Sequence, residues 1–117
     1  MKEHVNYEDI FKRFNEQLPK GVFLNTSFEG EYNTMTIGWG LVGITWSKPV
    51  VCVAVRFSRH TYSLLEKSNK FTISIPKTGT LKKELGICGT KSGRDIDKFE
   101  TCSFKKDKII DKCEMYF

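Results

Sequence analysis

The sequence predicts one mainly β domain with short helices, in which antiparallel strands form a barrel with helices at its periphery. A chain of 117 residues is typical of a single domain, which we expect to cover residues 1–117. Segments rich in β-branched and aromatic residues are joined mostly by turns, with only a few short helical stretches between them. The sequence has no G-x-G-x-x-G or P-loop motif, so no dinucleotide fingerprint favours a βαβ fold.

The chain begins with a predicted helix and a strand. Apolar side chains at helical spacing predict a helix over residues 7–15, which the Pro19-Lys20-Gly21 segment ends. Residues 22–27 then predict a strand. A turn over residues 28–31 follows, in which Gly30 is available for positive φ.

The central segment predicts strands interrupted by glycine. Residues 32–47 hold many β-forming residues, but Gly38, Gly40 and Gly43 make a flat packed sheet unfavourable here. Glycines in a strand pattern indicate bulges, bends or the close approach of a ligand. We expect a turn at Lys48-Pro49. Residues 50–56 are nearly all apolar and predict a strand buried on both faces.

The C-terminal half alternates helices and strands. Ser58 is a suitable N-cap for a helix that runs to about Lys67 and turns Tyr62, Leu64 and Leu65 inward. The remaining predictions are a strand at 71–75 stopped by Pro76, a short helix at 81–87, a polar loop at 90–95, and strands at 102–104 and 113–117 flanking a turn within 105–111.

Charge and hydropathy exclude several classes of protein. The net charge of +5 is dispersed and lacks the basic stripe with interleaved aromatics that nucleic-acid binding needs. It favours an anionic small molecule, which is attracted over the Debye length of ~8–10 Å. The N-terminus lacks the apolar region of a signal peptide, and the longest apolar run, Val50–Val55, is too short to span a membrane. We therefore expect a soluble cytoplasmic protein.

The four cysteines do not predict a metal site. Cys52, Cys88, Cys102 and Cys113 form no C-x-x-C pair and lie far from both histidines in sequence. We expect most of them to be small buried hydrophobic residues rather than disulfides. A nucleophilic Cys88 would need a nearby base, and no histidine lies close to it in sequence.

Residues 55–61 run from a predicted strand into a helix N-terminus, where backbone N–H groups and the helix dipole favour an anion. Arg56 and Arg59 are suited to charge-assisted hydrogen bonds with a phosphate, and Ser58 and Thr61 would add hydroxyl donors. The alternative is that Ser58 only caps the helix while the arginines are solvated.

Two other segments carry candidate binding residues. In residues 33–40, glycines permit the close approach of a planar ring, Trp39 would line an apolar slot, and Asn33 would lie at its rim. The alternative is a core tryptophan beside a bulged strand. In residues 88–99, Lys91 or Lys98 would neutralise a ligand charge, whereas the alternative is an ordinary surface loop.

These segments occur in a characteristic order. The telling strings are Asn-Thr-Met-Thr-Ile-Gly-Trp-Gly at 33–40, Ile-Thr-Trp-Ser-Lys-Pro-Val-Val at 44–51, Val-Arg-Phe-Ser-Arg-His-Thr at 55–61, Phe-Thr-Ile-Ser-Ile-Pro at 71–76 and Cys-Gly-Thr-Lys-Ser-Gly-Arg-Asp-Ile-Asp-Lys-Phe at 88–99. Through them, roughly residues 18–117 resemble the flavin reductase-like family of FMN-binding split barrels, and especially its flavoredoxin-like branch.

The resemblance implies a homodimer that holds FMN noncovalently near the subunit interface. By position, the isoalloxazine would meet Asn33, Met35, Thr36, Trp39 and Gly40, and Thr45, Trp46 and Ser47 would lie along the ring or ribityl chain. Arg56, Ser58, Arg59 and Thr61 would meet the phosphate, and Lys98, with Cys88, Gly89 and Lys91, would close the site. The flavin would perform the redox chemistry while the protein orients and tunes it.

The resemblance leaves two kinds of function open. Family members reduce flavin with NAD(P)H or pass electrons between protein partners. Members also continue well past the position of Phe117, so we expect a shortened chain and an incomplete barrel, whose open strand edge dimerisation would cover. The alternative function is a non-catalytic flavin- or anion-binding dimerisation module left by truncation.

Overall fold

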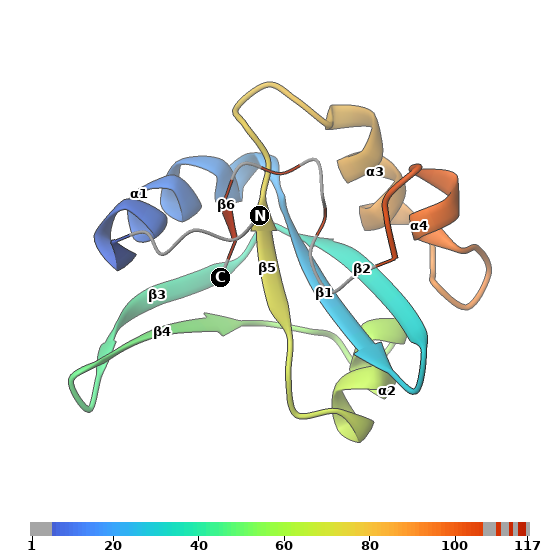
Figure 1. The fold of residues 1–117 in the computed structure, drawn as a ribbon, viewed down its shortest axis with the longest axis horizontal. Helices are drawn as coiled ribbons and strands as arrows, with labels where there is room; N and C mark the ends of the chain where they lie inside the picture. The colour runs from blue at the N-terminus through green and yellow to red at the C-terminus, as the bar shows by residue number, and fades with distance from the viewer. Residues whose placement is uncertain (1–5, 107–109, 111–112, 114, 117) are drawn as a thin grey trace.

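A computed structural model describes residues 6–106, 110, 113 and 115–116 as two sheets surrounded by short helices (Figure 1). One sheet has four antiparallel strands in the order β2-β1-β5-β6, and β3 and β4 form a separate hairpin. The strands are β1 (Val22–Phe28), β2 (Glu31–Ile37), β3 (Gly40–Thr45), β4 (Lys48–Val53), β5 (Thr72–Ile75) and β6 (Met115–Tyr116). The helices are α1 (Tyr7–Gln17), the 3₁₀ turn η1 (Leu18–Lys20), α2 (His60–Lys67), α3 (Lys82–Thr90) and α4 (Lys98–Thr101).

The fold agrees with the predicted class, mainly β with short helices. Within the described residues the two sheets do not close on each other into a complete barrel. Of the helices in this part of the chain, none is both long and apolar enough to cross a membrane.

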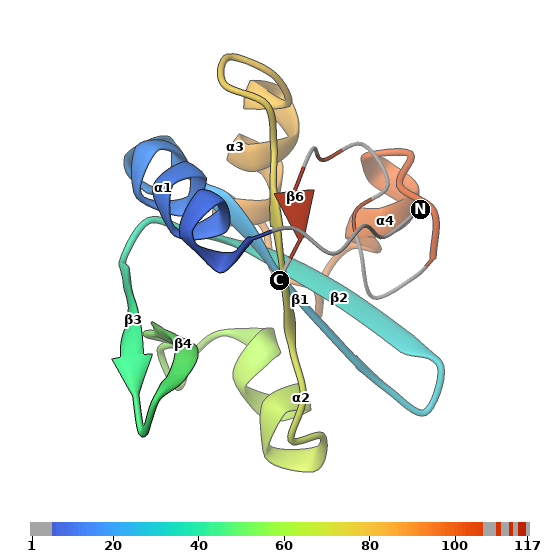
Figure 2. The same cartoon turned by 60° about the vertical axis from the view of Figure 1, so that its left-hand side comes forward.

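Strand β1 lies at the centre of the molecule and is buried on both faces. Val22 and Leu24 belong to a core that also contains Ile10 and Phe14 of α1. Phe23 points the other way, into a second core with residues of α3 and α4. Because successive strand side chains alternate between faces, β1 fills both cores at once. Figure 2 shows α1 and α4 on opposite sides of the sheet.

The predicted N-terminal helix and strand are confirmed. Asn6 caps α1 by accepting a hydrogen bond from the backbone N–H of Glu8. The chain leaves the helical segment through Gly21, whose φ of 111° disfavours other residues. The two-residue loop between β1 and β2 is also as expected, with positive φ at both Glu29 and Gly30, a combination that matches strand twist in a tight hairpin.

The glycine-rich segment divides between the two sheets. It forms β2 and then β3, and the chain bends at Gly38 and Trp39. Gly40 leaves little room for a side chain, because a Cβ there would lie 3.1 Å from the carbonyl oxygen of Cys52 and 3.2 Å from the ring of Phe14. The expectation that glycine would prevent a flat sheet here is confirmed.

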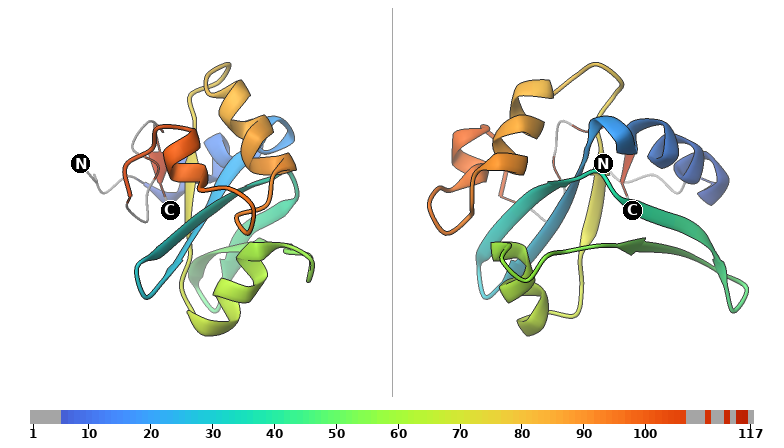
Figure 3. Two further views of the ribbon diagram at one scale, coloured as in Figure 1. Left: turned by 90° about the vertical axis from the view of Figure 1, so that its right-hand side faces the viewer. Right: turned by 180° about the vertical axis from the view of Figure 1, so that it is seen from behind.

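Two predictions for the β3–β4 hairpin are wrong. The turn lies at Trp46-Ser47 rather than Lys48-Pro49, and Lys48 already begins β4. The strand predicted over residues 50–56 ends at Val53. It is not buried on both faces, because Val50 is 40% exposed. The cause is the topology: among the described strands, β3 and β4 pair only with each other, and their hairpin extends beyond the main sheet (Figure 3).

Helix α2 differs from the prediction at its N-terminus. It begins at His60 with Arg59 as its N-cap, so Ser58 does not cap it. The side chains turned inward are those of Thr61 and Leu64, whereas Tyr62 and Leu65 are half-buried.

The C-terminal segment contains a helix that the sequence pattern did not predict. Asp97 caps the single-turn helix α4 by accepting hydrogen bonds from the N–H groups of Phe99 and Glu100. The predicted strand at 102–104 is wrong, because the chain turns at residues 102–103, directly after the end of α4. Of the predicted last strand at 113–117, Met115–Tyr116 form β6, while residues 114 and 117 lie outside the described residues. Residues 107–109 and 111 of the predicted turn within 105–111 also lie outside them.

Candidate functional site

Two adjoining cavities lie at the N-terminus of α2, and both are lined by Ser58 and Arg59. The smaller has a volume of about 190 Å³ and the larger about 410 Å³. The other residues of the smaller cavity are Asn33, His60, Thr61, Thr90, Lys91, Ser92, Gly93 and Lys98. Those of the larger are Met35, Thr36, Ile37, Gly38, Trp39, Ala54 and Arg56.

The smaller cavity is lined by polar side chains from four elements. Asn33 of β2 donates its amide N–H to the hydroxyl of Thr61 in α2, at 2.8 Å. The guanidinium of Arg59 donates to the carbonyl oxygens of Gly89 at 3.2 Å and Cys88 at 3.4 Å, at the end of α3. These hydrogen bonds fix Arg59 without neutralising its charge, because its partners are neutral carbonyls.

Lys98 is an almost fully buried cation beside this cavity, with 3% of its surface exposed. Its Nζ donates to the carbonyl oxygens of Thr34 at 2.8 Å and Cys88 at 3.0 Å. The pKa of Lys98 is lowered from 10.5 to about 8, mainly because the ammonium is buried. The nearby charge of Arg59 also lowers the pKa, and Cys88 acts in the opposite direction. The ammonium therefore loses its proton in the mildly alkaline range.

The electrostatics of the smaller cavity favour an anion. Arg59, Lys91 and Lys98 contribute positive charge, and the dipole of α2 adds partial positive charge at its N-terminus. No carboxylate lines the cavity among the residues that the structure describes. A group with two negative charges and several acceptor oxygens, such as a phosphate monoester, suits these donors.

Two exposed contacts hold the wall of the cavity in place. The Arg94 guanidinium donates to the carbonyl oxygen of Ser58 at 2.9 Å, which ties the loop after α3 to the turn before α2. The imidazole of His60 contacts the carboxylate of Glu31 on β2. Together these contacts orient the first turn of α2.

The larger cavity has an apolar wall and a polar rim. Met35, Ile37, Trp39 and Ala54 supply apolar surface. Arg56 lies in this cavity alone, and Arg59 lies where it meets the smaller one. Trp39 is 78% exposed, so the alternative of a core tryptophan is wrong. A flat apolar ring with polar edges suits this wall.

The structure brings most of the predicted binding residues together. Of these residues, Asn33, Met35, Thr36, Trp39, Arg56, Ser58, Arg59, Thr61, Lys91 and Lys98 line one or both cavities. Asn33, predicted beside the ring, lies with the residues predicted for the phosphate, and Arg56 lies in the larger cavity. Cys88 and Gly89 contribute backbone carbonyls that hold Arg59 rather than lining the cavity.

Besides Cys88 and Gly89, four predicted residues line neither the smaller nor the larger cavity. Thr45, Trp46 and Ser47 form the end of the β3–β4 hairpin, where Trp46 is 92% exposed, and Gly40 packs against the core. Figure 3 shows the tip of the hairpin far from α2.

The prediction missed several lining residues. His60, Ser92 and Gly93 lie inside the sequence strings that carry the family resemblance. Their position in these strings is the signal that could have identified them as lining residues. Ala54 had no comparable signal, because one apolar residue in an apolar strand carries no ligand chemistry.

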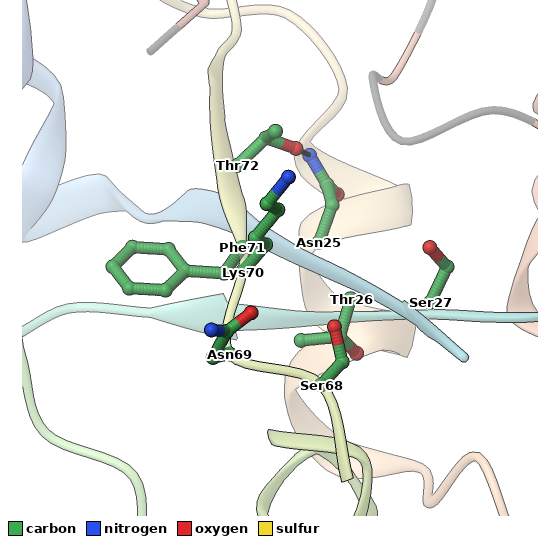
Figure 4. Close-up of a pocket in the computed structure, with 8 residues that line it drawn as sticks. All are labelled: Asn25, Thr26, Ser27, Ser68, Asn69, Lys70, Phe71 and Thr72. Carbon is green, nitrogen blue, oxygen red and sulfur yellow. Dashed lines mark hydrogen bonds between the residues drawn. The ribbon is translucent and has the colours of Figure 1, made fainter.

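A third cavity of about 360 Å³ lies near the C-terminal end of α2 (Figure 4). It is lined by Asn25, Thr26 and Ser27 of β1 and by residues 68–72. None of the residues that line it is among the predicted binding residues, so its volume alone does not indicate a role in binding.

The fold and the paired cavities define a two-sheet β protein with a cationic anion pocket beside an apolar slot. The family model described as "Flavin reductase like domain" matches residues 15–116. An uncharacterized protein of Archaeoglobus fulgidus is 32% identical over 103 residues, covering 82% of this chain and 57% of that protein. The chain therefore belongs to the flavin reductase like domain family.

Solved structures agree with this assignment. Flavoredoxin of Desulfovibrio vulgaris is 28% identical with a TM-score of 0.62, and the match covers 73% of this chain and 46% of that one. Flavoredoxin from Methanosarcina acetivorans is 24% identical with a TM-score of 0.68, over 82% and 53% of the two chains. An FMN-binding domain of a flavin reductases-like enzyme from Shewanella baltica is 19% identical with a TM-score of 0.77, over 96% and 61%. The chain thus spans about half the length of these relatives.

Gly93 provides a test of how tightly the smaller cavity is built. A Cβ at this position would lie 2.7 Å from His60 Cδ2 and would also clash with the Asn33 amide, so we expect Gly93→Ala to lower the stability by about 1–3 kcal/mol. Gly86→Ala is the matched control, because a Cβ there meets nothing within 4 Å, and a helical alanine should add about 0.5–1 kcal/mol. Urea denaturation measures both. Equal stabilities of the two variants would contradict the described packing at Gly93.

Proposed function

We propose that this chain binds FMN and serves as a flavoprotein of redox function. The observation that carries the proposal is the pairing of a cationic cavity, free of lining carboxylates in the described chain, with an apolar slot that shares Ser58 and Arg59 with it. FMN has the same two parts, a doubly charged phosphate and a planar ring. The relatives described as flavoredoxins and as an FMN-binding domain support this choice of ligand.

The residues present fit the two ends of FMN. Arg59, Lys91 and Lys98 would neutralise the phosphate, and the hydroxyls of Ser58 and Thr61 would donate to its oxygens. Met35 and Trp39 would cover the ring on one side, which limits its contact with water. No covalent attachment is required.

Bound flavin would supply transfer of one or two electrons. The chain would hold and orient the ring, exclude water from one face and keep positive charge near the phosphate. Either exchange with a redox protein or reduction by NAD(P)H is compatible with these roles. Retention of flavin absorbance in the visible range through gel filtration tests binding. NAD(P)H oxidation by the loaded protein tests the second activity.

We further propose that two copies of the chain form a homodimer through the β3–β4 hairpin. In the hairpin, Leu41 is 73% exposed, Ile44 is 54% exposed and Trp46 is 92% exposed. The contact of this apolar surface with water is energetically unfavourable. Trp46 and Ser47 both adopt positive φ, at 53° and 61°, which non-glycine residues adopt only at a cost. The hairpin tip of one protomer would then close the flavin site of its partner with Thr45, Trp46 and Ser47.

Arg59→Ala tests the position of the phosphate. Loss of charge-assisted hydrogen bonds, worth about 1.5–3 kcal/mol, should weaken FMN by at least about tenfold while riboflavin, which lacks the phosphate, changes little. Fluorescence quenching of each flavin on titration measures both constants. Arg13→Ala, on α1, is the control for net charge. If Arg59→Ala weakens both flavins equally, the assignment of the phosphate end is wrong.

The lowered pKa of Lys98 predicts a pH dependence of binding. Below about pH 8 the ammonium is charged and attracts the phosphate, and above it the protonated fraction falls. At about pH 9 roughly a tenth of the lysine remains protonated, so FMN affinity should fall by up to about tenfold relative to pH 7. Riboflavin titrated over the same range is the control. FMN affinity that stays constant to pH 9 would contradict this role of Lys98.

Leu41→Lys tests the homodimer. A charge on the exposed face of the hairpin should leave the fold intact and convert dimer to monomer in sedimentation velocity experiments, because burying an unpaired ammonium is costly. Tyr7→Lys places the same charge on α1, where we expect the dimer to persist. A dimer that survives Leu41→Lys would exclude the hairpin face as the interface.

A further inference from the structure

Two cysteine side chains meet between α3 and α4, behind the smaller cavity. The sulfur atoms of Cys88 and Cys102 lie 3.9 Å apart. Cys88 is fully buried and Cys102 is 5% exposed. Both are thiols in this structure, and neither is among the residues that line the cavities.

The same two residues are connected to the cations of the cavity through the backbone. The carbonyl oxygen of Cys88 accepts hydrogen bonds from Lys98 Nζ at 3.0 Å and from Arg59 at 3.4 Å. The N–H of Cys102 donates to the carbonyl oxygen of Lys98 at 2.9 Å, one helical turn earlier in α4. A bond between the two sulfurs would therefore link Cys88, which accepts hydrogen bonds from both cations, to α4, the helix that contains Lys98.

We propose that Cys88 and Cys102 form a reversible disulfide that fixes Arg59 and Lys98 in the wall of the anion cavity and tightens its hold on the ligand. The part of this proposal that concerns FMN rests on the proposed function. The disulfide itself rests on the position of the two sulfurs.

The reaction is a two-electron oxidation by a small oxidant such as a peroxide. The thiolate of one cysteine attacks the peroxide O–O bond, which gives a sulfenic acid and one water after proton transfer. The second thiol attacks that sulfur, so that an S–S bond forms and a second water leaves. Two thiols and hydrogen peroxide thus give one disulfide and two waters. An added dithiol restores the two thiols by exchange.

Disulfide formation requires the two sulfur atoms to move closer together. A disulfide has an S–S distance of about 2.05 Å, so the sulfurs must approach by roughly 1.9 Å. Cys102 follows the single-turn helix α4, and the next residue, Ser103, has a positive φ of 57°. Burial raises the pKa of the Cys88 thiol to about 12, so few thiolates form at neutral pH and the oxidation should be slow.

Peptide mapping tests the disulfide. Trypsin cleaves after Lys83, Lys91, Lys98 and Lys105, so Cys88 and Cys102 fall in the separate peptides 84–91 and 99–105. After peroxide treatment of the full chain, we expect these two peptides to be linked in mass spectrometry and to separate on reduction. Cys52→Ser, on the hairpin, is the control that should retain the link, and Cys102→Ser should abolish it. An absent link, or a link from 99–105 to Cys113, overturns the proposal.

FMN binding by the reduced and oxidised chains tests the coupling. Because the crosslink removes freedom of α4 relative to α3, oxidation should tighten FMN by at least about fivefold, the lower end of usual coupling between sites. The affinity of Cys102→Ser should not change with peroxide. Equal affinity of the two forms overturns the coupling. If neither form binds FMN, the proposed function fails, while the linked peptides still decide whether the disulfide exists.

Discussion

The buried ammonium of Lys98 is the interaction on which the candidate site depends. It joins β2 to α3 by donating to the carbonyl oxygens of Thr34 and Cys88, and it holds α4 against both. Burying a cation is costly unless its donors are satisfied, so the three elements must keep their relative positions for this residue to remain charged. The cavity wall is therefore positioned by a contact that lies mostly behind it.

The smaller cavity follows from that arrangement. Cys88 uses one carbonyl oxygen to hold both Lys98 and Arg59, which places two positive charges beside the first turn of α2. Since their partners are neutral carbonyls, the charges are oriented but not cancelled. A rigid cationic wall of this kind favours a phosphate more than flexible surface lysines would, because less ordering is needed on binding.

The β3–β4 hairpin lacks the support of the main sheet and leaves apolar residues exposed. It pairs with no other strand of the described chain, and its inner residues Val42, Val51 and Val53 only partly cover the first core. Its outer face and tip remain apolar and exposed, with two left-handed residues at the turn. Such a segment reaches a favourable environment only against another surface, which is why the proposed homodimer and the proposed flavin site involve the same hairpin.

Local patterns in the sequence determined much of this protein. The helix over residues 7–15, the strands β1 and β5, and the turn at Gly30 were all predicted, because each depends on contacts between near neighbours. The strings of the family resemblance also identified ten residues that line the paired cavities. Hydroxyl, guanidinium and ammonium groups can bind a phosphate wherever they lie in the fold, so their residue types alone indicate this chemistry.

Only the tertiary structure decided which apolar segment is central and which is exposed. Residues 22–24 and 50–53 are similarly apolar, yet β1 lies between two strands and two cores while β4 lies in a hairpin outside the main sheet. Hydropathy cannot distinguish them, because burial depends on strand order, which long-range pairing sets. The same holds for Asn33, which lies beside Thr61 at the anion cavity, and for the meeting of Cys88 with Cys102. These contacts join residues far apart in the chain, and packing between elements creates them.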